Sequence, residues 1–536
     1  MARKRLDRLS LLLFAAAAAY VIGILLINYH SAAWYTYDMY ADAYVARLMC
    51  QERTFFPKDW YFGNQYYIIA TPAVASLVYS LIPDSVSAMA LASSLMLGLI
   101  LFLFIWCCRP LFSTRAIAAG TLSLVGATIL GDSAANCVYG LQLFYTMASY
   151  YACYAWVLLF HLGIWIRLRR GLPVSALLPI LALLCDIALG LQSPRETLVL
   201  NLPLVLLAGF LVLQRKQETE KRGLRFALAA FVFNLFGLGA GRMIPAQRIP
   251  NIAPLQFNRS ASDLLAAFRA TASSFFELIG LRYLSQSWKW QILAGLAVVL
   301  FLVSVWALIK ALKTKPENDQ ALPLLFCWIS LLCVFGVGVL LFRVRAIYFF
   351  VWYLLLPFSL AYLVDSSPAG SARLLCCALL ACGMINAVYT FYPDYHRYSS
   401  QMQFYREIVA YLQDQEITVL YGDYEVPSIA ACSADTIRSS PIYPQADMAD
   451  GALLAPFGSP VSAVEYRHID PAHSLLVLSD SAYDEASGYR WLQSAASDAY
   501  KAEFENAFQL VNSFHSPNLS YYLYRFDDPA VMAEFR

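Results

Sequence analysis

The chain has 536 residues, of which 60% are hydrophobic and 14% are charged, and its mean hydropathy is +0.55. Charged residues make up about a quarter of a typical soluble protein, so the composition excludes that class and indicates a membrane protein. The 38 Lys and Arg residues nearly balance the 36 Asp and Glu residues, for a net charge of +2. Without a strong global field, we expect no nucleic-acid partner.

Apolar stretches long enough to cross a membrane recur from the start of the chain to about residue 391. A transmembrane helix needs about 20 mostly apolar residues. The first stretch is longer than the apolar core of a signal peptide, about 7–15 residues, so we interpret it as an uncleaved anchor. The eleven predicted spans are 9–28, 86–108, 114–131, 143–166, 174–191, 197–213, 225–244, 291–312, 321–342, 346–364 and 372–391. We therefore predict a mainly α, polytopic membrane helix bundle in a domain of residues 1–391.

The distribution of Lys and Arg predicts how the bundle is oriented. Short cytoplasmic loops hold an excess of these residues. With the N-terminus inside, the predicted inner loops are basic, from Arg109 and Arg115 to Arg373. This orientation places two long loops, 29–85 and 245–290, and the C-terminal tail outside. The short basic start and the few outward cysteines favour a bacterial plasma membrane.

The C-terminal tail, 392–536, changes composition and gains Asp, Glu, Ser and turn residues. Its pattern predicts helices and strands of a small extracytoplasmic α/β domain. No Gly-x-Gly-x-x-Gly follows a strand, so we expect no dinucleotide site, and the six histidines show no metal-ligand spacing. The predicted elements are helices at 402–413 and 484–500, and strands at 417–421, 474–478, 508–514 and 520–526.

The first outer loop carries two carboxylates at helical spacing. If residues 38–50 form a helix, Asp38 and Asp42 share one face. Like charges at this distance, together with desolvation near a membrane, raise the pKa of an Asp towards that of a useful general base. The alternative is that both are solvated surface acids that pair with Arg47 or Lys58. Aromatic residues such as Trp60 fit an interfacial belt, with sugar stacking as a further role.

Several arginines lie at the predicted outer ends of spans, against the charge rule. A charge near the membrane usually has a partner or a task. The planar guanidinium matches phosphate oxygens in a bidentate way, so these arginines are candidates for holding a lipid-linked phosphate. The alternatives are contact with lipid headgroups or pairing with Glu196, Asp132 or Glu277. The candidates are Arg195, Arg242, Arg343 and Arg345, the last shortly before Tyr348.

A first span, an Asp-bearing outer helix, an amphipathic segment at 68–81, many further spans and an outer α/β domain together resemble a glycosyltransferase of the C superfamily. These enzymes use polyprenyl-phosphate-linked sugars. The acidic doublet common in that loop is absent here, because Met39 follows Asp38.

The resemblance implies transfer of a sugar from a lipid-linked donor to a glycan, lipid or protein acceptor on the outer face. Asp38 or Asp42 would be the base, and the second carboxylate would orient the acceptor or hold a divalent cation. The outward arginines would bind the donor phosphate. The acceptor or the loop would contact Arg47, Lys58, Trp60 and Tyr348.

Two other functional classes stay open on the sequence. A transporter or flippase of lipid-linked or small polar substrates predicts ionisable residues deep within spans and a repeat between halves. Asp186 is the clear candidate for such a residue, and no repeat is evident. The second class is a non-catalytic membrane protein of envelope assembly, which keeps the shape without the base.

Overall fold

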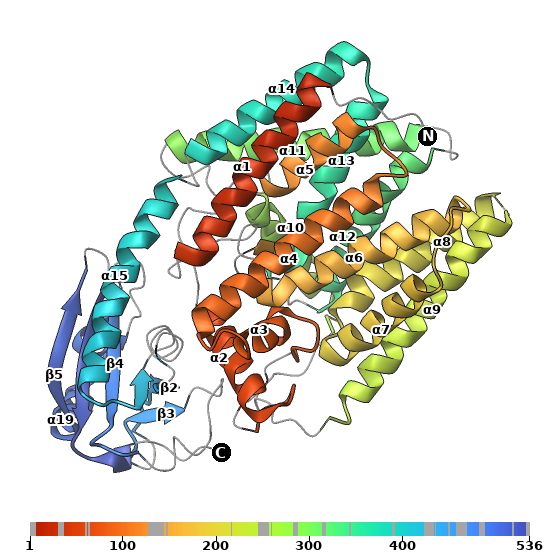
Figure 1. Cartoon of the computed structure of the whole chain (residues 1–536). Helices are drawn as coiled ribbons and strands as arrows, with labels where there is room; N and C mark the ends of the chain where they lie inside the picture. Colours follow the sequence, from red (N-terminus) through yellow and green to blue (C-terminus); the bar gives the residue numbers. More distant parts are fainter. Residues whose placement is uncertain are drawn as a thin grey trace.

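A computed structural model describes most of the chain as a helical bundle followed by a sheet-containing C-terminal part (Figure 1). All statements below concern the residues it describes, which are 7–30, 37–58, 60, 62, 65–126, 144–145, 148–215, 217–244, 257–258, 260–281, 288–313, 318–341, 345–388, 392–422, 434, 436–448, 451–456, 469–481, 488–516 and 519–531.

The bundle confirms the predicted fold class. Among the described residues, nine helices are long and apolar enough to cross a membrane, and two shorter apolar helices occupy the remaining predicted positions. Of the predicted span 114–131, the part beyond Gly126 lies outside the described residues. The helices are α1 (Arg8–His30), α4 (Ser85–Cys108), α5 (Thr114–Val125), α6 (Ala148–Arg169), α7 (Leu177–Gln192), α8 (Leu202–Arg215), α9 (Glu218–Gly241), α11 (Trp288–Lys313), α12 (Leu322–Leu341), α13 (Trp352–Ser366) and α14 (Ala369–Asn386).

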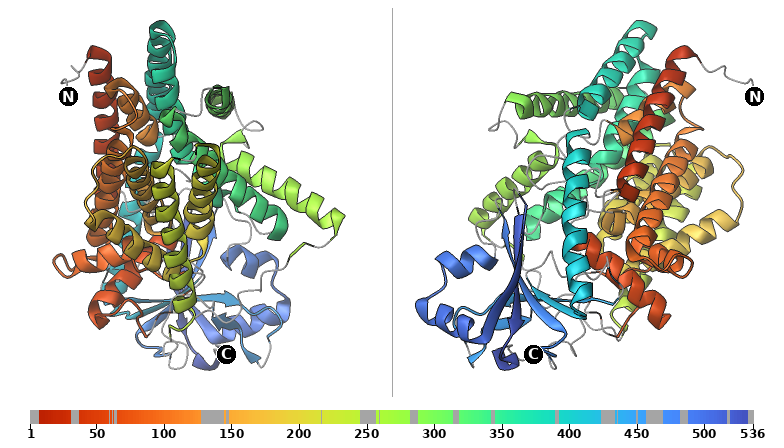
Figure 2. Two further views of the ribbon diagram at one scale, coloured as in Figure 1. Left: turned by 90° about the vertical axis from the view of Figure 1, so that its right-hand side faces the viewer. Right: turned by 60° about the vertical axis from the view of Figure 1, so that its left-hand side comes forward.

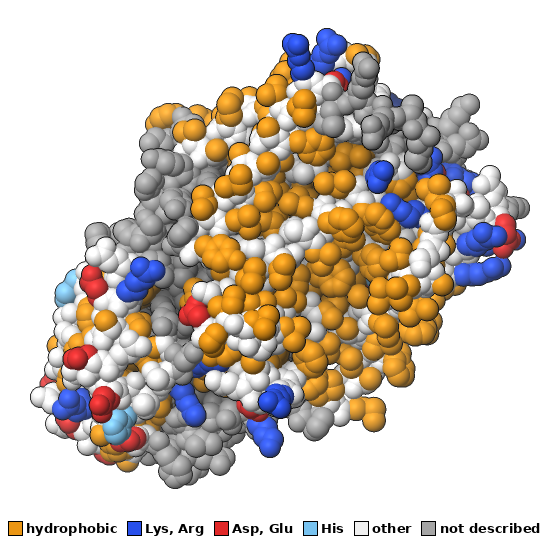
Figure 3. Space-filling model, in the orientation of Figure 1, with side chains coloured by type: hydrophobic (Ala, Val, Ile, Leu, Met, Phe, Trp, Pro, Cys, Tyr) orange, Lys and Arg blue, Asp and Glu red, His pale blue; other side chains and the backbone are white. Residues whose placement is uncertain are grey.

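The surface of the bundle matches its composition. Hydrophobic side chains cover the visible face of the helices, while Lys and Arg gather at the ends (Figure 3). Large apolar side chains such as Phe210 and Leu213 are exposed there. Because a helix satisfies its own backbone hydrogen bonds, such a face is stable against lipid.

Short helices lie at the ends of the bundle and between its spans. Local signals explain several starts, because Asp84, Ser113 and Ser260 each cap a helix by accepting from the backbone N–H three residues on. The short elements are α2 (Tyr37–Glu52), α3 (Thr71–Tyr79), α10 (Ala261–Leu278), the π-helical turn η4 (Thr197–Asn201) and the 3₁₀ turns η6 (Asp319–Ala321) and η7 (Ala346–Phe349). The predicted outer helix 38–50 lies within α2, the amphipathic segment 68–81 is helical over 71–79, and the loop predicted at 245–290 contains the helix α10.

The C-terminal part is an α/β unit with a six-stranded sheet in the order β3-β2-β1-β4-β6-β5. Strand β1 pairs in parallel with β2 and β4, and the remaining pairs are antiparallel. The elements are α15 (Tyr392–Asp414), β1 (Val419–Gly422), β2 (Arg438–Pro444), β3 (Leu454–Pro456), β4 (Ser474–Ser481), α18 (Gly488–Ser494), α19 (Asp498–Ala507), β5 (Phe508–His515), β6 (Leu519–Phe526) and the 3₁₀ turn η10 (Pro529–Val531).

The four predicted strands are confirmed, but two predictions in this unit were incomplete or wrong. Strands β2 and β3 were missed, since β2 contains Pro441 and Pro444 and β3 has only three residues. The single predicted helix at 484–500 is wrong. The structure has α18 and then α19, which restarts where the Ser497 side chain accepts from the N–H of Tyr500 at 3.1 Å.

Helix α15 connects the two parts of the chain. It stands between the bundle and the sheet (Figure 2). The Phe404 ring on α15 stacks on Tyr521 of β6, with ring centroids 5.7 Å apart. At the start of β2, the carbonyl of Ile437 accepts from Arg47 Nη2 of α2 at 3.4 Å. The C-terminal unit is thus attached both to α15 and to the first outer loop.

Helices α7 and α9 are in backbone contact. A Cβ on Gly190 would lie 2.2 Å from the Asn234 carbonyl, and one on Gly237 would lie 2.2 Å from the Ile187 carbonyl. Small residues of this kind let membrane helices approach closely. This contact between α7 and α9, the glycine seam, requires glycine at 190 and 237 because a side chain at either position would clash with the other helix.

We therefore predict that Gly190→Ala lowers the free energy of unfolding by about 1–3 kcal/mol, the usual cost of overpacking. Gly209→Ala is the matched control, because a Cβ there meets nothing within 4 Å. The free energy of unfolding of that variant should rise slightly, by about 0.5–1 kcal/mol, because alanine is a better helix residue than glycine. Thermal unfolding in detergent measures both. Equal transitions for the two variants would contradict the backbone contact.

Candidate functional site

Arg195 lies just beyond the C-terminal end of α7, where the chain leaves that helix. The Ser193-Pro194 pair explains the break, because a residue before proline favours extended backbone and Ser193 has φ −171° and ψ 153°. Arg195 Nη1 donates to Gln65 Oε1 at 2.6 Å. The guanidinium carbon lies 5.5 Å from the ring centroids of both Tyr151 and Tyr348. Two aromatic rings and one amide thus hold this cation.

Arg195 stays charged in this setting. Burial by itself lowers the pKa of an arginine, but the neighbouring hydroxyls, Tyr151 first and Tyr348 among them, raise the pKa of Arg195 above its usual value. A permanent cation at this end of the bundle is therefore available to an anion.

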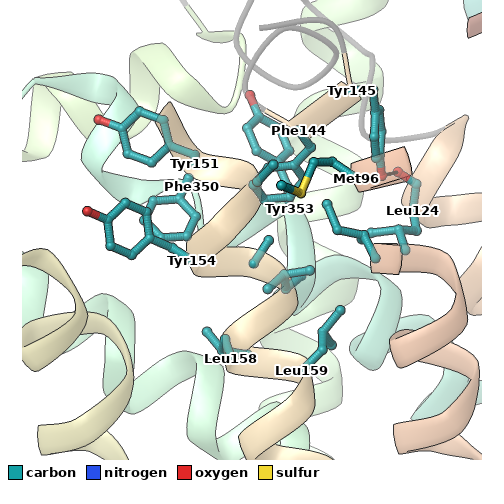
Figure 4. Close-up of a cluster of buried hydrophobic side chains, with 14 of the residues drawn as sticks. Met96, Leu124, Phe144, Tyr145, Tyr151, Tyr154, Leu158, Leu159, Phe350 and Tyr353 are labelled. Carbon is teal, nitrogen blue, oxygen red and sulfur yellow. Dashed lines mark hydrogen bonds between the residues drawn. The ribbon is translucent and has the colours of Figure 1, made fainter. Parts of the chain in front are cut away.

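Tyrosines from two elements face this cation. The hydroxyls of Tyr151 and Tyr154 of α6 point to the same side, away from the packed cluster that contains Phe350 and Tyr353 (Figure 4). The backbone N–H of Tyr348, in η7, donates to the Arg345 carbonyl at 3.0 Å. The Arg345 charge acts electrostatically on the Tyr151 hydroxyl. A second cation is thus close to the same tyrosine.

The end of α7 also fixes the outer loop that carries Gln65. The Gln192 carbonyl accepts from the N–H of Tyr66 at 3.1 Å, and Gln192 Oε1 accepts from the N–H of Ile68 at 3.2 Å. Tyr66 packs edge-on against Phe62, with centroids 5.1 Å apart. These contacts hold Gln65 where its amide oxygen reaches Arg195.

Helix α2 is buried along its middle, which excludes the alternative that Asp42 is a solvated surface acid. Asp42 is 0% exposed and Arg47 is 3% exposed. The Arg47 guanidinium lies over the Tyr44 ring at 4.7 Å, and Tyr44 packs on Trp60 with centroids 6.1 Å apart. Helix α2 packs on α3, α4 and Trp60 and contacts the C-terminal unit through Ile437, so that Asp42 is covered together with the apolar side chains of the helix.

The structure brings together part of the predicted set. Arg195, Arg345 and Tyr348 converge, whereas Arg242 is exposed at the C-terminal end of α9. Its neighbour Gly241 lies against Leu191, since a Cβ there would be 2.9 Å from the Leu191 carbonyl. Arg242 is therefore on the same rim of the bundle.

The remaining predicted residues are placed as follows. Lys58 is exposed, and its backbone N–H donates to the Glu52 carboxylate at 2.9 Å. Asp38 belongs to α2, but its side chain lies outside the described residues, as does all of Arg343. Sequence reasoning missed Gln65, Tyr151 and Gln192. Only the i, i+3 spacing of Tyr151 and Tyr154 was a signal, and core packing explains that spacing equally well.

The arrangement suits an anion with several oxygens. A guanidinium donates two parallel hydrogen bonds to a phosphate, and tyrosine hydroxyls donate to further oxygens. Because the site lies where the helices end, a phosphate bound there can keep an attached apolar chain along the lipid-facing surface.

Comparisons with known proteins give distant structural likenesses. The chain matches no protein-family model, and it matches no curated protein. It is similar to ArnT from Cupriavidus metallidurans in the apo state, with a TM-score of 0.40 and 13% sequence identity over 98% of each chain. It is also similar to ArnT from the same organism bound to undecaprenyl phosphate, with a TM-score of 0.41 and 13% identity, covering 96% of this chain and 97% of that one.

We predict that Arg195→Gln weakens the binding of a long-chain alkyl phosphate about tenfold or more, the usual size of one lost charge-assisted hydrogen bond. Microscale thermophoresis in detergent measures the affinity. Arg406→Gln, which removes an exposed arginine from α15, is the control and should bind as the wild type does. Unchanged affinity in Arg195→Gln would exclude this cation as the anion site.

Proposed function

We propose that this chain is a membrane glycosyltransferase. It transfers a sugar from a polyprenyl-phosphate-linked donor to an acceptor hydroxyl on the extracytoplasmic face. The observation that carries the proposal is the position of Arg195. This half-buried cation is held by Gln65 and two tyrosines at the predicted outer ends of the helices. The loop that supplies Gln65 is the one that carries α2 and its aspartates.

The donor phosphate is the group that Arg195 would bind. Positive charge stabilises the phosphate as it leaves, because negative charge develops on it in the transition state. Arg345 acts on the same Tyr151, and Arg242 lies on the same rim, so both are candidates for the remaining phosphate oxygens, together with Arg343. A phosphate leaving group needs no strong acid, and one carboxylate therefore suffices.

The acceptor needs a base that it can reach. The complete burial of Asp42 favours Asp38, four residues earlier on α2, as that base. The Asp38 carboxylate takes the hydroxyl proton, the acceptor oxygen forms a bond to the anomeric carbon, and the bond from that carbon to the phosphate oxygen breaks. The electron pair leaves with polyprenyl phosphate, and a single displacement inverts the anomeric carbon. In this proposal the buried Asp42 has a structural role in the packing of α2.

The predicted acceptor contacts also divide into buried residues and accessible ones. Arg47 and Trp60 are buried against Tyr44, so they support α2, whereas the exposed Lys58 and the half-buried Tyr348 are available to an acceptor. We assign the acceptor to the class of hydroxyl-bearing glycans, lipids or proteins.

The proposed orientation keeps the N-terminus in the cytoplasm of a bacterium and the C-terminal unit outside its plasma membrane. In support, an ion-pair cluster lies at the bundle end opposite to Arg195. Arg169 there donates to Glu220 at 2.5 and 2.6 Å and to Asp319 at 3.0 Å. Cytoplasmic ends hold such basic residues.

The test uses purified protein in nanodiscs with a labelled sugar on undecaprenyl phosphate, the lipid in one of the similar ArnT structures. We expect Asp38→Asn to lower transfer about 100-fold or more, the size of a general-base contribution. Asp414→Asn, at the exposed end of α15, is the matched control and should transfer normally.

Two results would contradict this account. Wild-type transfer by both Asp38→Asn and Asp42→Asn would exclude a base on α2. A wild-type protein that transfers no sugar from any polyprenyl donor, but moves the lipid-linked donor across liposomes, would establish the flippase alternative instead.

A further inference from the structure

A buried polar cluster lies directly behind Arg195, between α6, α7 and α9. These helices run side by side (Figure 1). His161, Asp186 and Asn234 are 0% exposed, and Glu196 is 1% exposed. Ionisable residues at such positions are costly and are rarely without a role. The mechanism proposed above uses none of the four.

His161 and Asp186 form the inner half of this cluster. His161 Nδ1 lies 2.9 Å from the Val157 carbonyl, and its Nε2 lies 2.9 Å from Asp186 Oδ2. A carbonyl only accepts, so Nδ1 carries a proton. The negative charge of the Asp186 carboxylate at Nε2 stabilises a second proton on the ring. The pair is therefore best described as an imidazolium with the Asp186 carboxylate.

Glu196 and Asn234 form the outer half. Asn234 Nδ2 donates to Glu196 Oε2 at 2.6 Å and to the Asp186 carbonyl at 3.2 Å. The orientation of this amide is fixed, because Asn234 Oδ1 accepts from the Thr197 hydroxyl at 2.5 Å. Glu196 Oε1 and Asp186 Oδ1 are both buried, and neither has a hydrogen-bond partner among the described residues, while the two carboxyl groups are close enough to interact.

Two carboxyl groups can be hydrogen-bonded to each other only if one of them carries a proton. His161 already balances one negative charge. The thiols of Cys153 and Cys185 are also close to Glu196 and supply no positive charge. The guanidinium of the adjacent Arg195 lies at Gln65 and the two tyrosines instead. Burial, followed by the facing Asp186, raises the pKa of Glu196 well above its usual value.

The packing holds the cluster closed. Gly190 lets the backbone of α9 approach α7 at Asn234 itself, because a Cβ there would meet the Asn234 carbonyl at 2.2 Å. Asn234 therefore cannot move away from Asp186 and Glu196 without opening the seam. Glu196 is in turn the residue next to Arg195 and immediately precedes η4.

We propose that Glu196 and Asp186 share one proton, and that this hydrogen bond makes Glu196 a positioning residue for Arg195. The cluster fixes the chain between α7 and η4, and so fixes where the guanidinium stands against Gln65, Tyr151 and Tyr348. The positioning role rests on the proposed function, because it concerns the donor-phosphate site, whereas the shared proton does not.

Infrared spectroscopy of the full-length protein in nanodiscs tests the proton directly. At neutral pH the wild type should show the C=O stretch of a protonated carboxyl group in a water-excluded site, and Glu196→Gln should lack it. Glu407→Gln, which removes an exposed glutamate from α15, is the control and should keep the band. A wild type without the band, or a Glu196→Gln variant that retains it, overturns the shared proton.

Undecaprenyl phosphate binding tests the positioning role. Glutamine is an isostere of protonated glutamate and can still donate to Asp186, so Glu196→Gln should bind the lipid within about twofold of wild type. Glu196→Ala should bind about tenfold or more weakly, the size of a lost hydrogen bond to a charged group.

Equal weakening in the Gln and Ala variants would show that the glutamate must be ionised, and wild-type affinity in the Ala variant would show that it positions nothing. Either result overturns the role. If the Ala variant does not fold, the infrared band and the Gln variant still decide. A wild type that binds no undecaprenyl phosphate would refute the proposed function and the positioning role together, while the band would decide the shared proton separately.

Discussion

The C-terminal end of α7 is the point on which both the bundle and the loop before α3 depend. Gln192 accepts hydrogen bonds from two successive parts of the loop, through its carbonyl and through its side chain. One residue later the chain becomes extended before Pro194, and the helix cannot continue. Without this break, Arg195 would lie on the lipid-facing or core-facing surface of a longer helix. With it, a permanent cation stands at the helix ends beside the first outer loop.

The packing of α7 against α9 also restricts the position of this helix end. The glycine seam brings α7 and α9 into backbone contact, and the seam encloses the polar cluster of Asp186, Glu196 and Asn234. Close packing gives such a cluster few alternative arrangements, since neither helix can rotate without a steric clash. The placement of one arginine thus follows from hydrogen bonds on its loop side and from packing on its membrane side.

Much of the fold was predictable from the sequence, and the site was predictable only in part. Hydropathy located the spans because a membrane requires long apolar segments, and the period-2 pattern located β4, β5 and β6. The charge rule singled out the arginines at the ends of the spans, and the structure brings Arg195, Arg345 and Tyr348 close together, while their role stays a prediction. Burial of Asp42 was not predictable, because the elements that cover it are distant in sequence. The role of Gln65 depends on a contact with Arg195, 130 residues away, which no local pattern contains.

The central claim is that Arg195 holds the phosphate of a lipid-linked donor. A cryo-electron microscopy structure of the protein with undecaprenyl phosphate in nanodiscs tests it most directly. The account predicts that the phosphate lies within hydrogen-bonding distance of the Arg195 guanidinium, about 2.7–3.2 Å, with its chain running down the lipid-facing side of the bundle. A phosphate bound elsewhere, with Arg195 still held by Gln65 and the tyrosines and free of the lipid, would contradict it.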